Sequence, residues 1–453
     1  MKILGIDIGT TTITALLLDA AQGNILKSCT LKNDSFISGR AFEKLQSPQK
    51  IIETVKTAVG ETCGDVTPDA IGVTGQMHGI LYLDESFAPC SPLMIWQDER
   101  GNELFRDNLT YAQYLTAETG IKAATGFGLT THFYNITNGE LPENAVMLCT
   151  IHDYLVSVLT GEKPVTHSSD AASLGFYNLG ENDFDRVALK KAGINQDFLP
   201  EVKKNTVIAG STKCDFLPHG IPVGVAIGDN QASFLGSVAE PDYSVLVNVG
   251  TGSQISFATK SIDAPESGEI RPLTDDSYIF VGSSLCGGRA YAILKGFFSL
   301  CADMLGGSKD DLYSKMDELS VDFFNIKNPL AVNCEFCGTR ENPSDRGSIT
   351  NIGTDNFTPG NLICGVLKGV ADELYGMFEK STELLTNKPT TLVCSGNGLR
   401  KSEMWRKIFE SIFSLSSALP KNSEEAAVGA CVFAGAASGI FKDIKASQNA
   451  LLR

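Results

Sequence analysis

Asp7, Gly9, Thr10 and Thr11 lie at the end of the apolar run ILGID near the start of the sequence. Small residues let backbone N–H groups converge on an anion, and threonine hydroxyl groups can donate further hydrogen bonds to phosphate oxygens. An aspartate beside a bound phosphate is favourable when Mg²⁺ lies between them. Asp7 is therefore predicted to contact Mg²⁺ through a water molecule. The alternative is a tight β-turn that binds no ligand.

A second run of the same kind, formed by Gly250, Thr251, Gly252 and Ser253, follows the apolar segment SVLVNV in the other half of the chain. Two such turns can hold a triphosphate from both sides, which a turn without a ligand does not explain. The sequence has no Gly-x-x-x-x-Gly-Lys-Ser/Thr run, so a Walker-type loop is excluded. We therefore expect ATP and Mg²⁺ to bind on two hairpins.

Asp229 closes the apolar run VAIGD and is followed by Asn230. Open α/β sheets bind their ligands at the carboxyl ends of strands. Phosphoryl transfer needs a positioned phosphate donor and one carboxylate that accepts the proton of the attacking hydroxyl group. Asp229 is predicted to be this general base, and Asn230 is predicted to bind sugar hydroxyl groups. The alternative is that Asp229 only caps the helix that begins at NQASF.

Two further polar stretches, QMH and WQDER, follow apolar segments and can complete an acceptor site. Their polar side chains can bind hydroxyl groups, methionine can form an adaptable apolar wall, and tryptophan can cover the face of a sugar. Each of these residues alone is more often part of a core, and it is their clustering after strands that favours binding. The predicted substrate-binding residues are Gln76, Met77, His78, Trp96, Asp98, Arg100 and Asn230.

Glycine-rich turns in the second half suit a nucleotide. Gly396, Asn397 and Gly398 lie between a predicted strand and a predicted helix, and Gly288 lies in a second pair of glycines. Such turns let adenine or ribose approach the backbone closely. The alternative is a plain connection between a strand and a helix.

The elements that must position these residues follow from apolar periodicity. Residues 3 to 19 and 244 to 259 share one plan of strand, small-residue turn and strand, and each opens about half of the chain, which suggests two related α/β domains. Further strands are expected within 70 to 84 and at 390 to 396. Helices are expected at 47 to 63, 361 to 385, 402 to 413 and 423 to 441.

Composition limits the class of protein. With 453 residues, the chain is long enough for two domains, and its formal net charge of −16 argues against nucleic acid or an anionic membrane as the main partner. The 12 cysteines are scattered, which is typical of reduced cytosolic thiols. The first residues enter a strand pattern directly, without a signal peptide, so we expect a cytoplasmic protein that binds a small molecule and can form a homodimer.

Taken together, these motifs resemble the FGGY carbohydrate kinases, which belong to the superfamily of sugar kinases, Hsp70 and actin. The resemblance covers nearly the whole chain and is carried by the Asp7 hairpin, QMHG, WQD, GDN, the Gly250 hairpin and the distal EEAAVGA. It implies an α/β fold with two ribonuclease H-like, actin-like ATPase domains and a central cleft. The implied domains are residues 1–240, with the sugar site and the first phosphate hairpin, and residues 241–453, with the nucleotide site.

Within the family, four stretches look most like the sedoheptulokinases: ATGFGLTTHFYN, TIHDYLV, SSDAASLGFYN and GTRENPSDRGSITNI. The resemblance therefore implies ATP-dependent phosphorylation of the terminal hydroxyl group of sedoheptulose. Xylulose, or the substrate of another pentulose or polyol kinase of the family, is the alternative. A nucleotide-dependent binding protein without catalysis is a further alternative, but it leaves the polar acceptor residues unexplained.

Overall fold

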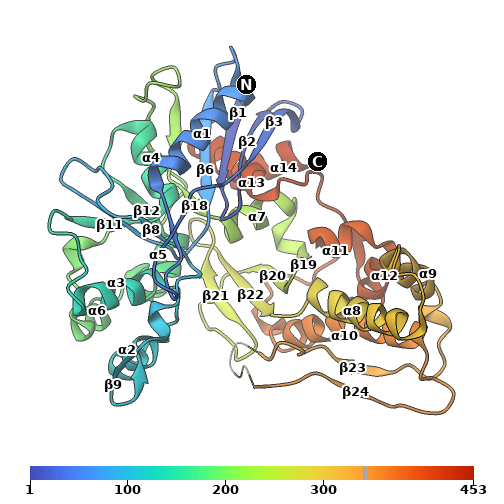
Figure 1. Ribbon diagram of the computed structural model, residues 1–453. Coiled ribbons are helices and arrows are strands. Elements are labelled where there is room, and N and C mark those ends of the chain that lie inside the picture. Colours follow the sequence, from blue (N-terminus) through green and yellow to red (C-terminus); the bar gives the residue numbers. More distant parts are fainter. Residues whose placement is uncertain (340–341, 343) are drawn as a thin grey trace. The chain divides into compact units, whose positions relative to one another are not determined.

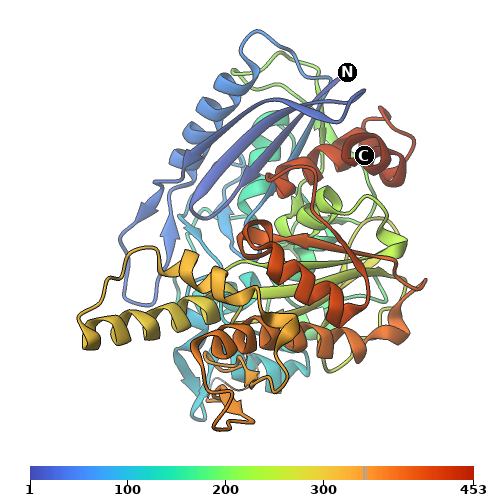
Figure 2. The ribbon, with the colours of Figure 1, turned by 90° about the vertical axis from the view of Figure 1, so that its right-hand side faces the viewer.

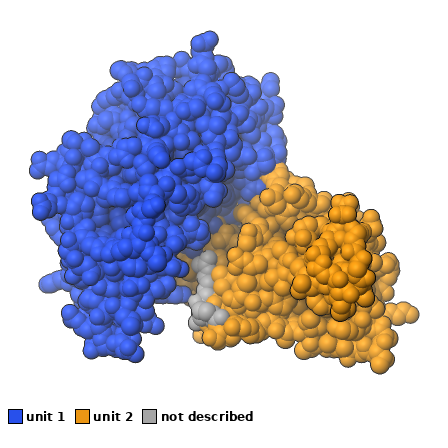
Figure 3. Space-filling model, viewed as in Figure 1, with its two compact units in different colours: residues 1–239, 271–277, 421–453 blue, residues 240–270, 278–420 orange. Residues whose placement is uncertain are grey.

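The structure is a computed structural model and describes residues 1–339, 342 and 344–453. It divides into two compact units, which are coloured separately in Figure 3. Unit 1 comprises residues 1–239, 271–277 and 421–453, and unit 2 comprises residues 240–270 and 278–420. Three positions of the GTRENPSDRGSITNI stretch lie outside the described residues. No helix of the described residues is long and apolar enough to cross a membrane.

Unit 1 is built on a sheet whose strands follow the order β16 (Ile208–Ser211), β17 (Pro222–Gly224), β6 (Ala70–Gly75), β1 (Lys2–Ile8), β2 (Thr12–Asp19) and β3 (Asn24–Lys32). β1 pairs with β2 in antiparallel orientation, which confirms the predicted N-terminal hairpin. β1 pairs with β6 in parallel orientation, and the short β18 (Ile227–Gly228) also pairs with β6 in parallel orientation (Figure 1). Three parallel strands therefore end at one edge of this sheet.

Successive side chains of a strand point to opposite faces, so β1 contacts helices on both sides. Leu4 and Ile6 lie in one apolar cluster with residues of α1 (Pro48–Cys63) and α4 (Ile151–Thr160). Ile3 and Gly5 contact α13 (Glu425–Ala437) on the other face, beside α7 (Asp229–Ser237). Figure 2 shows the long strands β1 to β3 side by side, with α1 along them.

Helix α13 approaches the sheet and α7 at backbone contact distance. A Cβ atom at Gly429 would lie 1.8 Å from the carbonyl oxygen of Ala232 in α7. A Cβ atom at Gly72 in β6 would lie 2.0 Å from the carbonyl oxygen of Ala430. Real Cβ atoms do not come this close to an oxygen, so only glycine fits at these positions. The distal EEAAVGA motif is thus a packing motif in unit 1.

This packing changes the expected division of the chain. The expectation of one boundary, with residues 241–453 in a second domain, differs from the observed units because residues 421–453 belong to unit 1. The reason is that α13 fits only against the glycines of β1, β6 and α7. Helix α14 (Ile444–Leu452) packs on α13 and extends the same layer (Figure 1).

The remainder of unit 1 has its own apolar core, with Tyr82, Leu129 and Leu174 among its buried residues. β7 (Leu81–Leu83) pairs here with β11 (Met147–Cys149) and not with β6, although both strands were expected in the segment 70 to 84. The helices of this part are α2 (Tyr111–Thr119), α3 (Gly128–Thr137), α5 (Ser168–Leu174) and α6 (Arg186–Ala192). Its short strands are β4 (Phe36–Ile37), β5 (Leu45–Gln46), β8 (Leu93–Met94), β9 (Leu104–Arg106), β10 (Leu109–Thr110), β12 (Val165–His167), β13 (Tyr177–Asn178), β14 (Asp183–Phe184) and β15 (Glu201–Lys203).

Unit 2 repeats the plan of the first sheet, with β22 (Tyr278–Ser284), β20 (Ser253–Thr259), β19 (Ser244–Val249), β25 (Thr391–Ser395) and β26 (Ser416–Ala418) in that order. β19 and β20 form the predicted antiparallel hairpin, and β25 pairs with β19 in parallel orientation. β21 (Glu269–Pro272) is the edge strand of this sheet, next to β22, and β23 (Ala331–Asn333) and β24 (Ser348–Thr350) form a separate two-stranded sheet. The helices are α8 (Gly288–Leu305), α9 (Leu312–Ser320), α10 (Pro359–Glu379), α11 (Gly396–Lys401) and α12 (Glu403–Phe413).

The close packing of α13 predicts the effect of one methyl group. We expect Gly429→Ala to lower the free energy of unfolding by about 2 to 3 kcal/mol, because α13 and α7 must move apart. Gly60→Ala is the matched control, since Gly60 lies in the exposed part of α1 with no atom within 4 Å of a built Cβ. The free energy of unfolding of this control should rise by about 0.5 to 1 kcal/mol. Urea unfolding followed by circular dichroism measures both, and equal midpoints for the two variants would contradict the packing argument.

Candidate active site

The carboxyl edge of the unit 1 sheet holds the predicted catalytic residue Asp229 together with residues that are predicted to bind ligands. The parallel register places Ile8 of β1, Gly75 of β6 and Gly228 of β18 in one row. The residues that follow this row, among them Gln76 and Asp229, therefore leave the sheet at the same edge. This is the position at which open α/β sheets bind ligands.

Asp229 is the first residue of α7, but its side chain does not cap the helix. Gly228 is the N-cap residue, and no side-chain hydrogen bond caps this end. Burial raises the pKa of Asp229 to about 6, the neighbouring Asp170 adds to this, and His152 opposes it. A carboxylate with this pKa is ionised at neutral pH and can still accept a proton.

Asp7 lies near the end of β1 and shares this edge. Burial raises its pKa to about 7, and the charges of Asp229 and Glu424 add to the shift. Its Oδ1 atom is buried and has no hydrogen-bond partner among the described residues. Two partly buried carboxylates of like charge and an unsatisfied oxygen fit a divalent cation such as Mg²⁺, which prefers oxygen ligands.

Thr10 connects the first hairpin to the predicted acceptor residues. Its hydroxyl group donates to Gln76 Oε1 at 3.1 Å and accepts from Trp96 Nε1 at 3.0 Å. Gln76 Nε2 donates to Gln46 Oε1 at 2.8 Å, and Gln46 Nε2 donates to the Thr10 carbonyl oxygen at 2.9 Å. The ring of contacts brings together residues that are predicted to bind phosphate and residues that are predicted to bind sugar. Gln46 was not among the predicted residues, because no local pattern marks it.

His78 is held in a strained backbone conformation after β6. Its φ of 73° is unusual for a residue with a side chain, and such strain is common at functional sites. The backbone N–H donates to Ser173 Oγ at 3.2 Å, Nδ1 lies 2.7 Å from the Ser173 carbonyl oxygen, and the ring stacks on Phe127. Because only a protonated nitrogen can donate to a carbonyl oxygen, Nδ1 carries a proton. Met77 is buried against Gly228, next to Asp229.

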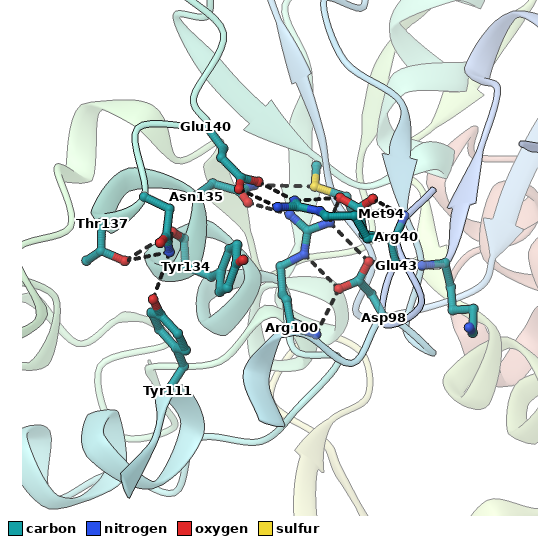
Figure 4. A network of polar contacts seen from close by, with 12 residues as sticks. Arg40, Glu43, Met94, Asp98, Arg100, Tyr111, Tyr134, Asn135, Thr137 and Glu140 are labelled. Atoms are coloured by element: carbon teal, nitrogen blue, oxygen red, sulfur yellow. Dashed lines mark hydrogen bonds and ion pairs between the residues drawn. The ribbon is translucent and has the colours of Figure 1, made fainter. Parts of the chain in front are cut away.

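Asp98 and Arg100 bind each other instead of presenting open polar groups (Figure 4). Arg100 Nε donates to Asp98 Oδ1 at 2.7 Å, and Arg100 also donates to Asn135. Asp98 is 0% and Arg100 is 2% exposed. The expectation that both bind sugar hydroxyl groups directly does not match this geometry, since their hydrogen-bonding groups are already used inside unit 1. The pair anchors the loop behind Trp96, which is 46% exposed.

In unit 2, the second hairpin is held by the start of α8. The backbone N–H groups of Gly287 and Gly288 donate to the carbonyl oxygens of Thr251 and Gly250 at 3.0 and 2.7 Å. A Cβ atom at Gly288 would lie 2.7 Å from the Gly250 oxygen, so glycine is required for this contact. The hydroxyl group of Ser253 is buried without a hydrogen-bond partner in the described part of the chain.

The turn formed by Gly396, Asn397 and Gly398 lies at the end of β25, beside the second hairpin. Gly396 has a φ of 81°, and a Cβ atom there would lie 2.5 Å from the Val249 carbonyl oxygen. Because Val249 directly precedes Gly250, the turn and the hairpin are neighbours. Unit 2 thus brings together its predicted nucleotide-binding residues.

A buried cluster of His152, Asp153 and Asp170 was missed by sequence reasoning. One ligand atom from each of the three residues lies within 4.8 Å of the others, and all three side chains are 0% exposed. The only local signal was that two of the stretches that resemble sedoheptulokinases, TIHDYLV and SSDAASLGFYN, contain them. Nothing in either stretch indicates that the two fold onto each other.

The buried ion pair predicts a strong effect on stability. Arg100→Met would leave Asp98 buried without its cation, and we expect a loss of about 3 to 5 kcal/mol in the free energy of unfolding. Lys213→Met is the control, because Lys213 pairs with Glu162 at 2.5 Å on the surface, where both side chains are more than half exposed. The control should change by less than about 1 kcal/mol. Thermal unfolding of both variants gives the comparison, and similar losses would contradict the assignment.

The chain is similar to known carbohydrate kinases in sequence and in fold. The model of the N-terminal domain of the FGGY family of carbohydrate kinases matches residues 2–236. The chain is 27% identical to mouse sedoheptulokinase, covering 90% of this chain and 92% of that protein. It is 25% identical to gluconokinase of Bacillus subtilis, covering 96% and 87%. Its fold is similar to the crystal structure of xylulose kinase from Rhodospirillum rubrum, with a TM-score of 0.85 over 100% of this chain and 93% of that one at 20% identity.

These matches establish the α/β fold with two actin-like ATPase-type domains. They also establish that the protein is a kinase that acts on a small sugar, in a family whose members use ATP as the phosphate donor. The chain belongs to the FGGY family of carbohydrate kinases.

Proposed function

We propose that the enzyme transfers the γ-phosphoryl group of ATP to the terminal hydroxyl group of a ketose, with sedoheptulose as the leading substrate and sedoheptulose 7-phosphate as the product. The observation that carries this proposal is the position of Asp229 at the carboxyl edge of the unit 1 sheet, with a pKa of about 6. One carboxylate at such an edge suffices to accept the proton of the attacking hydroxyl group.

The acceptor sugar binds beside this base. His78 and Asn230 offer polar groups for its hydroxyl groups, and Trp96 offers an exposed ring for its face. Gln76 is buried and acts by holding Thr10, because its amide group is bound to Thr10 and Gln46. Met77 supplies an apolar wall next to Gly228. Asp98 and Arg100 act in this proposal by holding the Trp96 loop, because their polar groups are bound to each other.

The nucleotide phosphates bind the small-residue turns. In unit 1 the proposed phosphate-binding residues are Gly9, Thr10 and Thr11. In unit 2 the proposed nucleotide-binding residues are Gly250, Thr251, Gly252, Ser253, Gly288, Gly396, Asn397 and Gly398. Asp7 holds Mg²⁺, through water, with its unsatisfied oxygen. When bound, Mg²⁺ supplies positive charge that neutralises the phosphate oxygens during transfer.

The choice of sedoheptulose rests on the coverage of the mouse relative and on the four stretches that resemble sedoheptulokinases. Xylulose is the second candidate, because the xylulose kinase of Rhodospirillum rubrum shares the fold over the whole chain. The two sugars differ in length, so the side chains that meet the far end of the acceptor decide between them.

Replacement of the base tests the proposed chemistry. We expect Asp229→Asn to lower kcat by about 10³-fold or more, since a neutral amide cannot accept the proton, while KM for the sugar stays within about threefold. Asp65→Asn is the matched control, because Asp65 is exposed in the turn after α1. Steady-state ADP release measures both. Wild-type turnover in Asp229→Asn would overturn the assignment of the base.

A panel of acceptors tests the substrate. We expect kcat/KM for sedoheptulose to exceed that for xylulose, ribulose, gluconate and glycerol by about tenfold or more, because contacts to the additional hydroxyl groups are made only by the longer sugar. ADP release at matched concentrations, with no sugar as the control, gives the ranking. Equal or greater efficiency with xylulose would contradict sedoheptulose as the substrate and leave the kinase mechanism intact.

A further inference from the structure

His152 of α4 is a fully buried histidine whose surroundings favour the charged form. Burial alone would lower its pKa, but the carboxylates of Asp170, Asp153 and Asp229 outweigh burial and raise the pKa to about 9. Two other buried histidines of unit 1, His132 and His167, behave differently, because burial lowers the pKa of each to about 4. His152 is therefore distinguished by its neighbours and not by its depth.

A continuous line of polar contacts runs from His152 to the backbone that carries Asp229. His152 Nε2 lies 2.9 Å from Asp170 Oδ1, and Ser169 Oγ donates to Asp170 Oδ2 at 3.2 Å. The backbone N–H of Gly228 donates to Ser169 Oγ at 3.1 Å. Gly228 is the N-cap of α7, and Asp229 is the next residue. All members of this line are buried, so water does not compete for their hydrogen bonds.

The charges around this line are mostly negative. Asp7, Asp153, Asp170 and Asp229 all act on one another or on His152, and Glu424 acts on Asp7. The cations that act on Asp229 are His152 and, more weakly, Arg271. Burial raises the pKa of Asp7, Asp153 and Asp229, and a buried positive charge offsets that penalty.

We propose that His152 is a positioning residue for phosphoryl transfer: as an imidazolium ion it fixes Gly228 through Asp170 and Ser169, and its charge keeps Asp229 ionised. The inference rests on the proposed function, which assigns Asp229 as the base. The separation of 2.9 Å between Nε2 and Oδ1 is that of an ion pair, and its direction is not that of a hydrogen bond, so the contact rests on the opposite charges of the imidazolium ion and the carboxylate.

Two substitutions at one position separate charge from hydrogen bonding. His152→Gln keeps a donor for Asp170 but removes the charge, and His152→Lys restores the charge. In the wild type, log(kcat/KM) should fall as the pH drops through about 6, because Asp229 becomes protonated. In His152→Gln this fall should begin about one pH unit higher, and kcat/KM at pH 6.5 should drop about threefold. His152→Lys should largely restore the wild-type pH dependence and the wild-type kcat/KM at pH 6.5. KM for the sugar should change little in either variant.

His219→Gln is the matched control, because His219 is an exposed histidine of the same unit. It should show the wild-type profile. A wild-type profile in His152→Gln would overturn the inference, and so would a loss in His152→Lys as large as the loss in His152→Gln, with both variants folded by circular dichroism. If Asp229→Asn is inactive while His152→Gln is normal, the inference fails and the proposed function stands. If Asp229→Asn is fully active, the proposed function itself fails.

A second measurement needs no variant at His152 to fold. Nuclear magnetic resonance of protein labelled at the histidine ring carbons reports the protonation of each imidazole, and the chain has only five histidines. The resonance of His152 should keep the chemical shift of an imidazolium ion at pH 7.5, whereas the resonances of His132 and His167 should show neutral rings. A neutral His152 at pH 7 would overturn the inference independently of any kinetic result.

Discussion

The parallel pairing of β6 with both β1 and β18 is the constraint on which the rest of the structure depends. Parallel strands end at the same edge, so segments that lie far apart in the sequence deliver Gly9, Gln76 and Asp229 to one place. Without this register the polar residues would be scattered along separate loops. The helices on the two faces, α1 and α4 on one and α7 and α13 on the other, keep the strands in register by burying both sides of them.

A sheet edge at which several carboxylates lie close together also needs positive charge that compensates their negative charge. Asp7 and Asp229 share a partly buried site near the deeper Asp153 and Asp170, and burial raises the pKa of Asp7, Asp153 and Asp229. Opposite charge can come from a divalent cation on the open side and from His152 on the closed side. In this view the chemistry of the base depends as much on the cluster beneath it as on the substrate above it, because both set the free energy of its ionised form.

Much of this arrangement can be predicted from local sequence. The hairpins around Gly9 and Gly250, the strand before Gln76 and the helix at 402 to 413 follow from apolar periodicity and from small residues at turns. Three features could not be predicted in this way: the place of α13 in unit 1, the mutual pairing of Asp98 and Arg100, and the contact of His152 with Asp170. Each depends on which segments meet in space, and a single sequence does not encode that in its spacing. The motif WQDER shows the difficulty, since identical residue types can face a ligand or each other.

The return of residues 421–453 to unit 1 has a consequence for how the chain is made. Gly5 of β1 and Gly72 of β6 lie against backbone and side-chain atoms of α13, so this face of the unit 1 sheet stays uncovered until α13 arrives. On a ribosome, all of unit 2 is synthesised before that helix, which is a delay on the order of ten seconds or more at ordinary rates. Unit 2 can therefore complete its core first. The unit that starts the chain is then the last to close, and nascent unit 1 is the part of the protein that most needs protection from aggregation.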